Sequence, residues 1–221
     1  MRVLIFGATG MLGQAALLEC ERDHGVESIV ALGRTPVVGD HPKLTNLIHA
    51  DLANYDGLDA QLTGFDACFF TLGVTSNGMN EANYTRVTYG FTLAAAEALS
   101  RLNPGMAFIY VSGSGTDRSE KGRSMWARVK GRTENALLRL SLSAYMFRPG
   151  FIQPMDGIES KTPSYRIFYK VLAPLMPLLH KALPNQVLTT REIGQAMVSV
   201  ARHGYEKHIL ETRDIRAVVS R

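Results

Sequence analysis

Residues 3–13 read Val3-Leu4-Ile5-Phe6-Gly7-Ala8-Thr9-Gly10-Met11-Leu12-Gly13. The four apolar residues at 3–6 predict a short buried strand, and residues 11–20 predict a helix directly after it. A glycine turn that leads a strand into a helix presents unpaired amides at the positive end of the helix dipole, and both favour a phosphate. This stretch therefore predicts a pyrophosphate site at the first strand–helix junction.

The three glycines have the spacing G-x-x-G-x-x-G, which differs from the commoner G-x-G-x-x-G of dinucleotide sites. Gly7 permits the tight turn, Gly10 lets the backbone approach a pyrophosphate, and Gly13 lets the helix pack close to the strand. The motif resembles the fingerprint of the extended and atypical short-chain dehydrogenase/reductases, close to nucleoside-diphosphate-sugar epimerase-like NAD(P)-binding proteins. The resemblance covers residues 2–152 strongly and the remainder loosely. A glycine-rich turn without a ligand is the alternative.

Composition favours a single α/β domain of 221 residues, of which 46% are hydrophobic. The net charge of +4 comes from 24 basic and 20 acidic residues. The basic residues neither cluster on one helix nor interleave with aromatics, so we expect no nucleic-acid partner. Cys20 and Cys68 are expected to be buried reduced thiols, which fits a cytoplasmic protein with no signal peptide before the first strand. The apolar stretch 167–183 is too interrupted for a membrane span, and the six histidines show no metal-binding spacing.

Short apolar runs alternate with helical patterns along the chain. Strands are predicted at residues 3–6, 28–32, 46–49, 67–72, 107–111, 144–147 and 208–211, and the clearest helices at 81–101 and 124–140. This alternation predicts a doubly wound, Rossmann-like parallel sheet in one domain over residues 1–221. Residues 153–190 are expected to form a small substrate-side or lid segment, with an apolar, proline-broken helical cover at 165–183. Thr190 is expected to cap a helix that runs to Arg202, and a helical turn is expected at 214–219.

Ligands of such sheets bind beyond the carboxyl ends of the strands. The second strand ends in Gly33-Arg34, where an NAD-preferring site has an acidic residue for the ribose 2′-hydroxyl. An arginine instead pairs with the 2′-phosphate of NADP through two parallel hydrogen bonds. The missing acid and the added cation favour NADP (NADPH), and an ordinary exposed arginine is the alternative.

The resemblance assigns further cofactor contacts at later strand ends. After the third strand it implies that Asp51 meets the adenine and that the next residue lines the adenine pocket, although an aspartate there is also an ordinary cap or loop residue. Gly73, after the fourth strand, lets the chain pass close to the ribose and phosphates. The residues after the sixth strand would pack against the nicotinamide, or form an ordinary strand-ending turn. The expected cofactor-binding residues are Gly7, Thr9, Gly10, Met11, Leu12, Gly13, Arg34, Asp51, Leu52, Thr71, Leu72, Gly73, Lys130, Pro149, Gly150, Phe151 and Ile152.

The helix predicted at 124–140 contains the catalytic position. The family has Tyr-x-x-x-Lys here, and the i, i+4 spacing puts both side chains on one helix face. In the family the lysine holds the nicotinamide ribose and lowers the tyrosine pKa, and the tyrosine transfers a proton beside hydride transfer. This chain has Lys130, but Trp126 stands at the tyrosine position. Gly131 and Glu134 match the Lys-Gly-x-x-Glu pattern of the atypical branch.

Tryptophan cannot replace tyrosine as an acid, because its indole N–H is a donor without an accessible acid–base equilibrium. Loss of a general acid typically removes about 10²–10⁴-fold of rate. Ser112 and Ser114, after the fifth strand, suit a site for a substrate oxygen or an ordinary turn. The catalytic candidates are Ser112, Ser114, Trp126 and Lys130. Five possibilities stay open: no acid is needed, water or a serine relays the proton, Tyr84 or Tyr89 reaches in, nothing is turned over, or Trp126 is a core aromatic.

The sequence thus predicts an NADP(H)-binding protein that is similar to short-chain dehydrogenase/reductases. If it is an enzyme, it is an oxidoreductase or epimerase that acts on a small carbonyl or hydroxyl substrate. The alternative is a non-catalytic module whose NADP(H) state controls a protein partner. The family often dimerises through the helices at 81–101 and 124–140, so the chain is expected to be a monomer or a homodimer.

Overall fold

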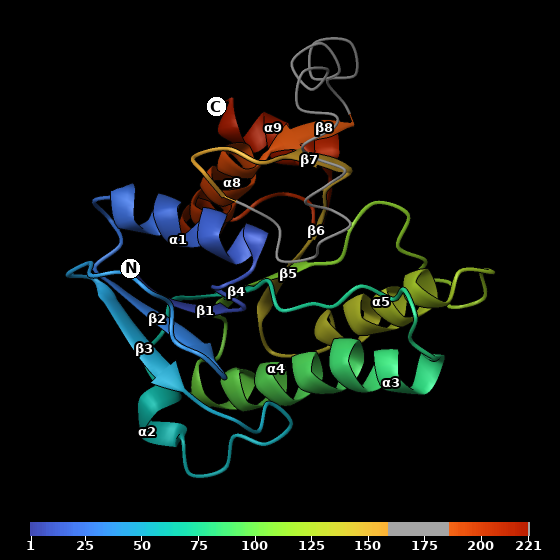
Figure 1. The fold of residues 1–221 in the computed structure, drawn as a ribbon, viewed down its shortest axis with the longest axis horizontal. Helices are drawn as coiled ribbons and strands as arrows, with labels where there is room; N and C mark the ends of the chain where they lie inside the picture. The colour runs from blue at the N-terminus through green and yellow to red at the C-terminus, as the bar shows by residue number, and fades with distance from the viewer. Residues whose placement is uncertain (159–185, 221) are drawn as a thin grey trace.

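A seven-stranded, entirely parallel sheet forms the centre of this computed structural model, which describes residues 1–158 and 186–220 (Figure 1). The spatial order of its strands is β3-β2-β1-β4-β5-β6-β9. This order reverses between β1 and β4, as in doubly wound folds, and confirms the predicted fold class. The strands are β1 (Arg2–Phe6), β2 (Ser28–Gly33), β3 (Leu44–Ile48), β4 (Ala67–Phe70), β5 (Ala107–Val111), β6 (Ser143–Arg148) and β9 (Ile209–Glu211).

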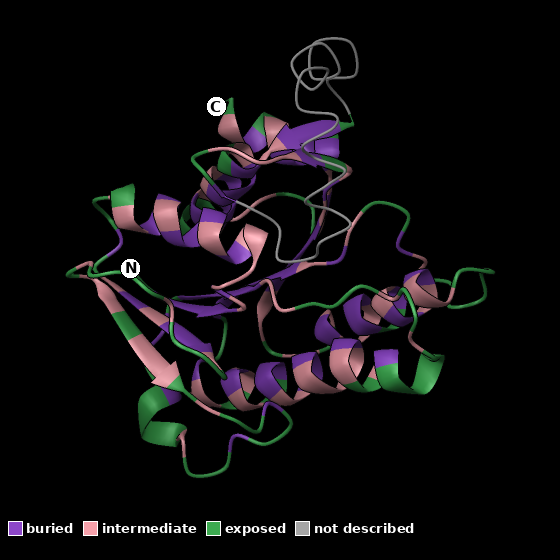
Figure 2. Ribbon diagram, in the orientation of Figure 1, coloured by how far each residue is buried: buried purple, intermediate pink, exposed green. Residues whose placement is uncertain are grey.

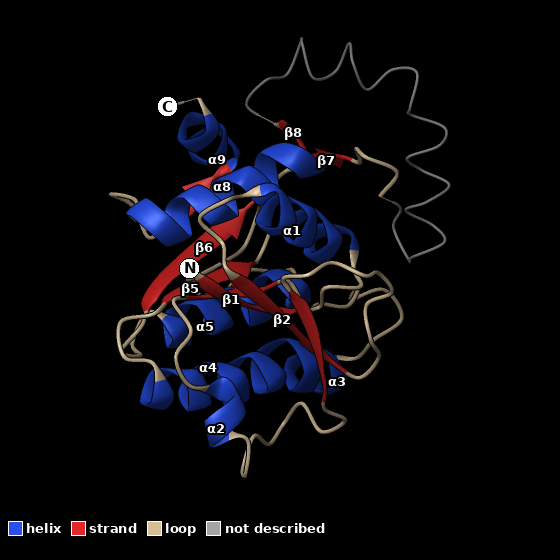
Figure 3. Ribbon diagram, turned by 90° about the vertical axis from the view of Figure 1, so that its left-hand side faces the viewer, coloured by secondary structure: helices blue, strands red, loops and turns tan. Residues whose placement is uncertain are grey.

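Helices cover both faces of the sheet (Figures 1 and 3). One face carries α1 (Met11–Arg22), α8 (Thr190–His203) and α9 (Thr212–Val219). The other carries α2 (Asp59–Leu62), α3 (Glu81–Thr85), the π-helical turn η1 (Arg86–Gly90), α4 (Phe91–Leu102) and α5 (Met125–Leu137). Two apolar clusters fill the spaces between the sheet and these two helical layers.

The central strand β1 shows why the strands read as unbroken apolar runs. Side chains alternate between the two faces of a strand, so Val3 and Ile5 enter one cluster while Leu4 and Phe6 enter the other. All four are at most 1% exposed, and Figure 2 shows the buried centre of the sheet between its half-exposed helices. A strand with helices on both sides has no face to leave polar.

The helical region predicted at 81–101 is present, but it is not one regular helix. It consists of α3, the five-residue π turn η1 and α4, end to end. A π turn widens the helix by one residue, and such turns often occur at functional sites. Periodicity over the whole region averages across this insertion, which is why the sequence pattern did not reveal it.

The predicted cap of α8 is wrong by one residue. Thr189 is the N-cap: its hydroxyl accepts from the Glu192 amide at 3.0 Å, and its own amide donates to the Glu192 carboxylate at 2.6 Å. This is a reciprocal capping box. Thr190 is fully buried, and its hydroxyl accepts from the Met155 amide at 2.9 Å.

Two short strands that the sequence did not reveal, β7 (Phe151–Gln153) and β8 (Val187–Thr189), pair in parallel as a separate sheet. They lie at the two ends of the segment predicted as a lid. The helical cover expected at 165–183 falls outside the described residues, so the lid remains a prediction. No helix in the described ranges is long and apolar enough to cross a membrane.

The prediction that both cysteines are buried free thiols is confirmed. Cys20 and Cys68 are both buried free thiols. Burial raises the pKa of each thiol, so neither is a reactive thiolate.

Candidate functional site

The glycine turn after β1 has the geometry that the sequence predicts. Gly7 has a φ of +78°, and its carbonyl accepts from the Gly10 amide at 2.8 Å. A Cβ on Gly7 would lie 2.7 Å from the Leu72 nitrogen, and one on Gly13 would lie 2.1 Å from the Gly7 oxygen. Gly7 therefore permits the turn beside β4, and Gly13 permits the close approach of α1 to β1.

The N-terminus of α1 is open to an anion. Its N-cap, Gly10, provides no side-chain hydrogen bond, and the first turn of the helix contains no acidic residue. The first amides of this 12-residue helix are thus left to a ligand, and the positive end of its dipole has no local counter-charge.

A cavity of about 370 Å³ opens at the carboxyl ends of β1 and β2, beside the point where the strand order reverses. It brings together five of the predicted cofactor residues from four separate chain segments: Gly7, Thr9, Arg34, Leu52 and Leu72. Its other lining residues are Phe6, Ala8, Ala31, Leu32, Gly33, Thr35 and Val37. The lining is mostly apolar, with one cation and no carboxylate among the described residues.

Arg34 supplies that cation. Its side chain is exposed at the cavity and makes no hydrogen bond or ion pair with the described residues. Nothing within the described protein neutralises its guanidinium. An anionic group in the cavity would therefore meet an uncompensated positive charge.

The residues predicted after β3 and β4 divide between the cavity and the scaffold. Leu52 is buried and lines the cavity, whereas Asp51 is exposed and its carboxylate accepts from the Ala53 amide at 3.0 Å. That bond is the local turn contact of the alternative interpretation. The Thr71 hydroxyl donates to the Phe6 carbonyl at 2.7 Å, which ties the ends of β4 and β1 together. Gly73 is exposed after β4.

Helix α5 places Trp126 and Lys130 beside the end of β5. A Cβ on Gly115, in the turn after β5, would lie 3.5 Å from Cη2 of Trp126. The Lys130 Nζ donates to the carbonyls of Val111, at 3.4 Å, and Ser112. Burial lowers the pKa of Lys130 to about 8, and the charge of Glu134 acts in the opposite direction.

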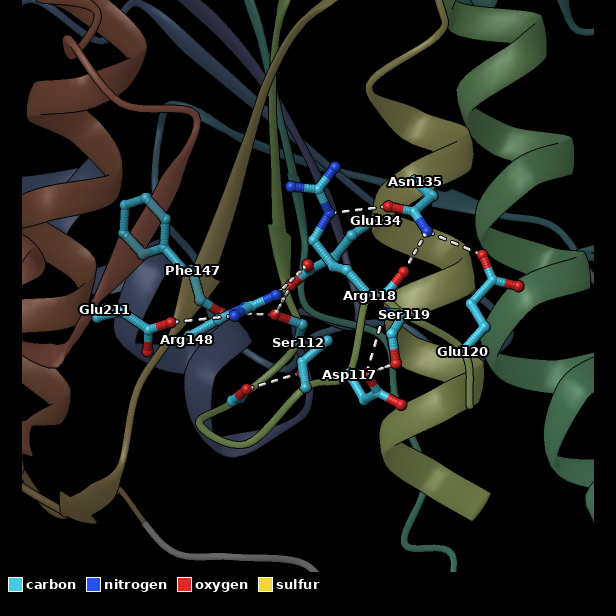
Figure 4. Close-up of polar contacts among 12 residues, drawn as sticks. Ser112, Asp117, Arg118, Ser119, Glu120, Glu134, Asn135, Phe147, Arg148 and Glu211 are labelled. Carbon is cyan, nitrogen blue, oxygen red and sulfur yellow. Dashed lines mark hydrogen bonds and ion pairs between the residues drawn. The ribbon is translucent and has the colours of Figure 1, made fainter. Parts of the chain in front are cut away.

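Gly131 has a steric reason to follow Lys130. A Cβ at this position would lie 1.8 Å from the Asp117 carbonyl oxygen, because the loop after β5 passes directly over α5. Asn135 holds the same loop: it accepts from Arg118 Nε at 2.8 Å and donates to the Glu120 carboxylate at 2.8 Å (Figure 4).

A buried ion pair lies between α5 and β6, at the left of the α5 helix in Figure 4. Arg148 donates to both oxygens of Glu134, from Nε at 2.9 Å and from Nη2 at 2.6 Å. The Ser112 hydroxyl donates to the same carboxylate at 2.6 Å, and Arg148 Nη1 reaches Glu211 at 3.0 Å. Glu134 is completely buried. In the sequence, Glu134 stands out only as part of the Lys-Gly-x-x-Glu pattern, because its partner Arg148 lies 14 residues away.

This pair includes Ser112, one of the catalytic candidates. Its side chain is only 3% exposed, and its hydroxyl donates to Glu134. Ser112 therefore supports the ion pair, and its catalytic role stays a prediction. Ser114 is exposed, and its amide donates to the Pro149 carbonyl at 3.0 Å, so it joins the ends of β5 and β6.

Of the two candidate tyrosines, Tyr84 is buried and Tyr89 is half-buried. Tyr84 is 2% exposed in α3, and the ring of Tyr89 in η1 lies under the guanidinium of Arg132 at 4.4 Å. At the end of β6, Pro149 and Ile152 are buried, while Phe151 is 56% exposed. A Cβ on Gly150 would lie 2.5 Å from the Gln186 carbonyl oxygen, so this glycine accommodates the chain before β8.

Met11 and Leu12 are half-buried at the start of α1 and pack against the apolar cluster beneath it. Their side chains therefore face the core, and a contact of their amides with a pyrophosphate stays a prediction. Within residues 1–158 and 186–220, no group of three or more histidine, cysteine or acidic side chains could hold a metal ion.

Comparison with known proteins identifies the fold. No family model matches the chain. It is 28% identical over 230 residues to the Leucinostatins biosynthesis cluster protein T of Purpureocillium lilacinum, across 89% of this chain and 83% of that protein. It is 26% identical over 155 residues to Protein FMP52, mitochondrial, of Candida albicans, across 68% of this chain and 66% of that protein.

Solved structures match almost the whole chain. A putative epimerase from Burkholderia cenocepacia J2315 matches with a TM-score of 0.69 at 16% identity, over 99% of this chain and 80% of the other. The UDP-N-acetylglucosamine 4-epimerase from Methanobrevibacter ruminantium M1 matches with a TM-score of 0.70 at 14% identity, over 99% and 81%. The enzyme WbmF from Bordetella bronchiseptica, solved with NAD⁺, matches with a TM-score of 0.68 at 15% identity, over 98% and 76%. The resemblance to extended short-chain dehydrogenase/reductases is thus confirmed at the level of the fold.

Proposed function

We propose that this chain binds NADP(H) with its adenosine half in the cavity beside β1 and β2, and that it is an oxidoreductase or epimerase acting on a small carbonyl or hydroxyl substrate. The observation that carries the proposal is the combination of an open α1 N-terminus with a cavity in which Arg34 is the one charged side chain among the described lining residues. A dinucleotide presents a pyrophosphate and a flat apolar base, which match these two features.

The residues fit the cofactor in distinct ways. The Gly7–Gly13 turn would hold the pyrophosphate, since it leads into α1, whose N-terminus has no side-chain cap and no acidic residue in its first turn. Arg34 would pair with the 2′-phosphate of NADP, because it is exposed at the cavity without a partner among the described residues. Leu52 and Leu72 would enclose the adenine, with Asp51 at its edge. Lys130 would hold the nicotinamide ribose. Phe151, an exposed apolar side chain just after β6, would pack against the nicotinamide.

Catalysis would depend on the nicotinamide and on side chains near the end of β5. The nicotinamide, when bound, supplies hydride transfer. The chain contributes the Lys130 ammonium at the end of β5 and the exposed hydroxyl of Ser114. Since Trp126 supplies a hydrogen-bond donor without an acid–base equilibrium, a substrate proton would come from water or through Ser114. We favour Ser114 over Ser112, because the Ser112 hydroxyl donates to Glu134.

Trp126 also favours a second candidate function, a non-catalytic module whose NADP(H) state controls a protein partner. The tryptophan occupies the position of the general acid in the resembling family, while the surrounding frame of Lys130 and Gly131 is intact. In that case cofactor binding would persist without turnover. The two free buried cysteines are compatible with the cytoplasm, which we propose as the location, and a monomer or homodimer as the assembly.

The experiment that tests the proposal is a titration with NADPH and NADH, followed by the fluorescence of Trp126, the single tryptophan, and by calorimetry. We expect NADPH to bind at micromolar concentration and to quench Trp126, and NADH to bind far more weakly. A carbonyl panel then separates the two functions: turnover supports the enzyme, and bound NADPH without turnover supports the module. Absence of heat with both cofactors would refute cofactor binding.

A further inference from the structure

Lys130 and Glu134 are one helical turn apart on α5, a spacing that commonly produces an ion pair. In this structure they do not pair. The Lys130 Nζ donates to the carbonyls of Val111 and Ser112, and among the described residues it forms no ion pair with a carboxylate. Both side chains nevertheless contact Ser112, Lys130 at its carbonyl and Glu134 at its hydroxyl. The ammonium and the carboxylate therefore lie close enough to pair if either were released.

Arg148 accounts for this separation. It donates to Glu134 Oε1 at 2.9 Å and to Oε2 at 2.6 Å, so both oxygens of the carboxylate are occupied. Ser112 adds a third bond, to Oε1, at 2.6 Å. A two-pronged arginine–carboxylate pair is stronger and more directional than a lysine–carboxylate contact. The side chains of Arg148 and Glu134 are 12% and 0% exposed, so water does not compete for either.

We infer that Arg148 is a positioning residue for Lys130: by holding both oxygens of Glu134 it keeps this carboxylate out of an ion pair with Lys130, and so leaves Lys130 available to a ribose hydroxyl. The identity of the ligand rests on the proposed function, whereas the relation among the three side chains does not. An ammonium has three donors. Two of them meet the carbonyls at the end of β5, and an ion pair with Glu134 would take the third.

Within the part of the chain that the structure describes, the carboxylates of β9 and α3 are paired with other cations. Glu211 of β9 is held by Arg148 at 3.0 Å, and Glu81 of α3 by Arg128 at 2.7 Å. Titratable side chains on the elements around α5 are Glu81 and Tyr84 on α3, Arg86 and Tyr89 on η1, Glu97 and Arg101 on α4, Tyr110 on β5, Tyr145 and Arg148 on β6, Glu211 on β9, and Asp117 in the loop over Gly131. Among the described residues, Arg148 is the cation that contacts Glu134.

The pKa of Lys130 reports directly on this arrangement. Burial lowers it to about 8, and Glu134 opposes the shift from a position where Arg148 already neutralises it. If Arg148 loses its charge, Glu134 becomes the nearest partner for the ammonium. An opposite charge at contact distance typically changes a pKa by about 1–3 units, so the pKa of Lys130 should then rise by that amount.

The test is an NMR titration of the Lys130 side chain in cofactor-free protein with ¹³C-labelled lysine, assigned by the loss of its signal in Lys130→Arg. In Arg148→Met we expect the pKa of Lys130 to rise by about 1–3 units. The matched control is Arg132→Met, which removes the same charge from the exposed side of the same helix and should change the pKa of Lys130 by about 0.3 units or less. An unchanged or lower pKa in Arg148→Met would overturn the inference, because Glu134 would then have taken a proton instead of pairing.

A second variant separates ion pairing from the loss of the Arg148 charge, which by itself raises the pKa of a neighbouring ammonium. Arg148→Lys keeps the positive charge but replaces the two-pronged contact with both Glu134 oxygens by a single ammonium. We expect the pKa of Lys130 to rise in Arg148→Lys as well, and Glu134→Gln in the Arg148→Met background to abolish the rise. An unchanged pKa in Arg148→Lys, or a rise of equal size in the double variant, would overturn the inference.

The cofactor is tested separately. If wild-type protein does not bind NADPH in calorimetry, the proposed function fails, and the titration still judges the role of Arg148. If wild-type protein binds NADPH, Arg148→Met should weaken binding by about 10-fold, the effect of losing one charged hydrogen bond. Unchanged affinity alongside a raised Lys130 pKa would overturn the ribose part of the inference alone.

Discussion

Replacement of Arg34 by methionine tests the cofactor assignment with the least disturbance to the fold. Arg34 is exposed after β2, lines the cavity, and makes no bond to another described residue. The variant should therefore unfold at the same temperature as the wild type. The substitution should change only the affinity for the ligand, and only for a ligand that carries the 2′-phosphate.

The size of the effect follows from the exposure of Arg34. A hydrogen bond to a charged group typically contributes about 1.5–3 kcal/mol, which corresponds to about 10- to 150-fold in a dissociation constant. Solvent screening at an exposed site reduces the contribution, so we take the lower end. NADPH should bind about 10-fold more weakly to Arg34→Met, and NADH should bind as it does to the wild type.

Calorimetry with NADPH and NADH at two salt concentrations measures this difference. The preference of wild-type protein for NADPH should shrink at high salt, since the interaction is between exposed charges. Arg139→Met is the matched control: Arg139 is an exposed arginine between the end of α5 and the start of β6, at the amino ends of the strands, whereas the cavity lies at their carboxyl ends. Equal weakening of NADPH and NADH in Arg34→Met, or equal weakening in Arg139→Met, would refute the assignment.

Three further substitutions test other parts of the site. Gly13→Ala places a Cβ 2.1 Å from the Gly7 oxygen, and overpacking of this kind should lower the melting temperature by about 2–12 °C; Gly33→Ala, whose Cβ would meet nothing nearer than 3.8 Å, should not, and equal melting temperatures would contradict the packing role. Trp126→Tyr restores the acid position, so turnover on a carbonyl panel with NADPH should rise by about 10²-fold or more, and no rise would favour the non-catalytic module. Lys130 has a pKa lowered from 10.5 to about 8 in the folded chain; the unfolded chain then binds more protons between these values, so wild-type stability should gain on that of Lys130→Met as the pH rises from 8 to 10.5. Denaturant unfolding across this pH range measures the difference in unfolding free energy between wild type and Lys130→Met. If this difference does not change with pH, folding does not lower the pKa of Lys130.

The fold was predictable because its strands are buried on both faces. Apolar runs such as residues 107–111 locate a strand without any knowledge of its neighbours, and β5 spans the same five residues as predicted. The glycine turn was equally accessible, since its steric requirements are local to β1 and α1. Boundaries decided by a single hydrogen bond were harder: Thr189 and Thr190 are chemically identical, and only the geometry of Glu192 selects the first as the cap.

The reactive end was less accessible from the sequence because its contacts are long-range. Ser112 looked available for a substrate until β6 and α5 were placed around it. Its hydroxyl then proved to belong to a pair made by Glu134 and Arg148, which meet only across the sheet. The i, i+4 spacing of Lys130 and Glu134 was visible in the sequence, but the identity of the cation that holds Glu134 was not.

The π turn η1 determines how the helical region between β4 and β5 can change among related chains. A π turn amounts to one residue inserted into an α-helix, and each residue of an α-helix advances the chain by about 100°. Deletion of a single residue within 86–90 would restore a regular helix and rotate α3 about its axis by that angle relative to α4. Tyr84 would leave the core, and Glu81 would turn away from Arg128 on α5. Among related chains, gain or loss of one residue here would therefore reorient the whole of α3 in a single step, whereas substitutions elsewhere in the helix would only retune its surface.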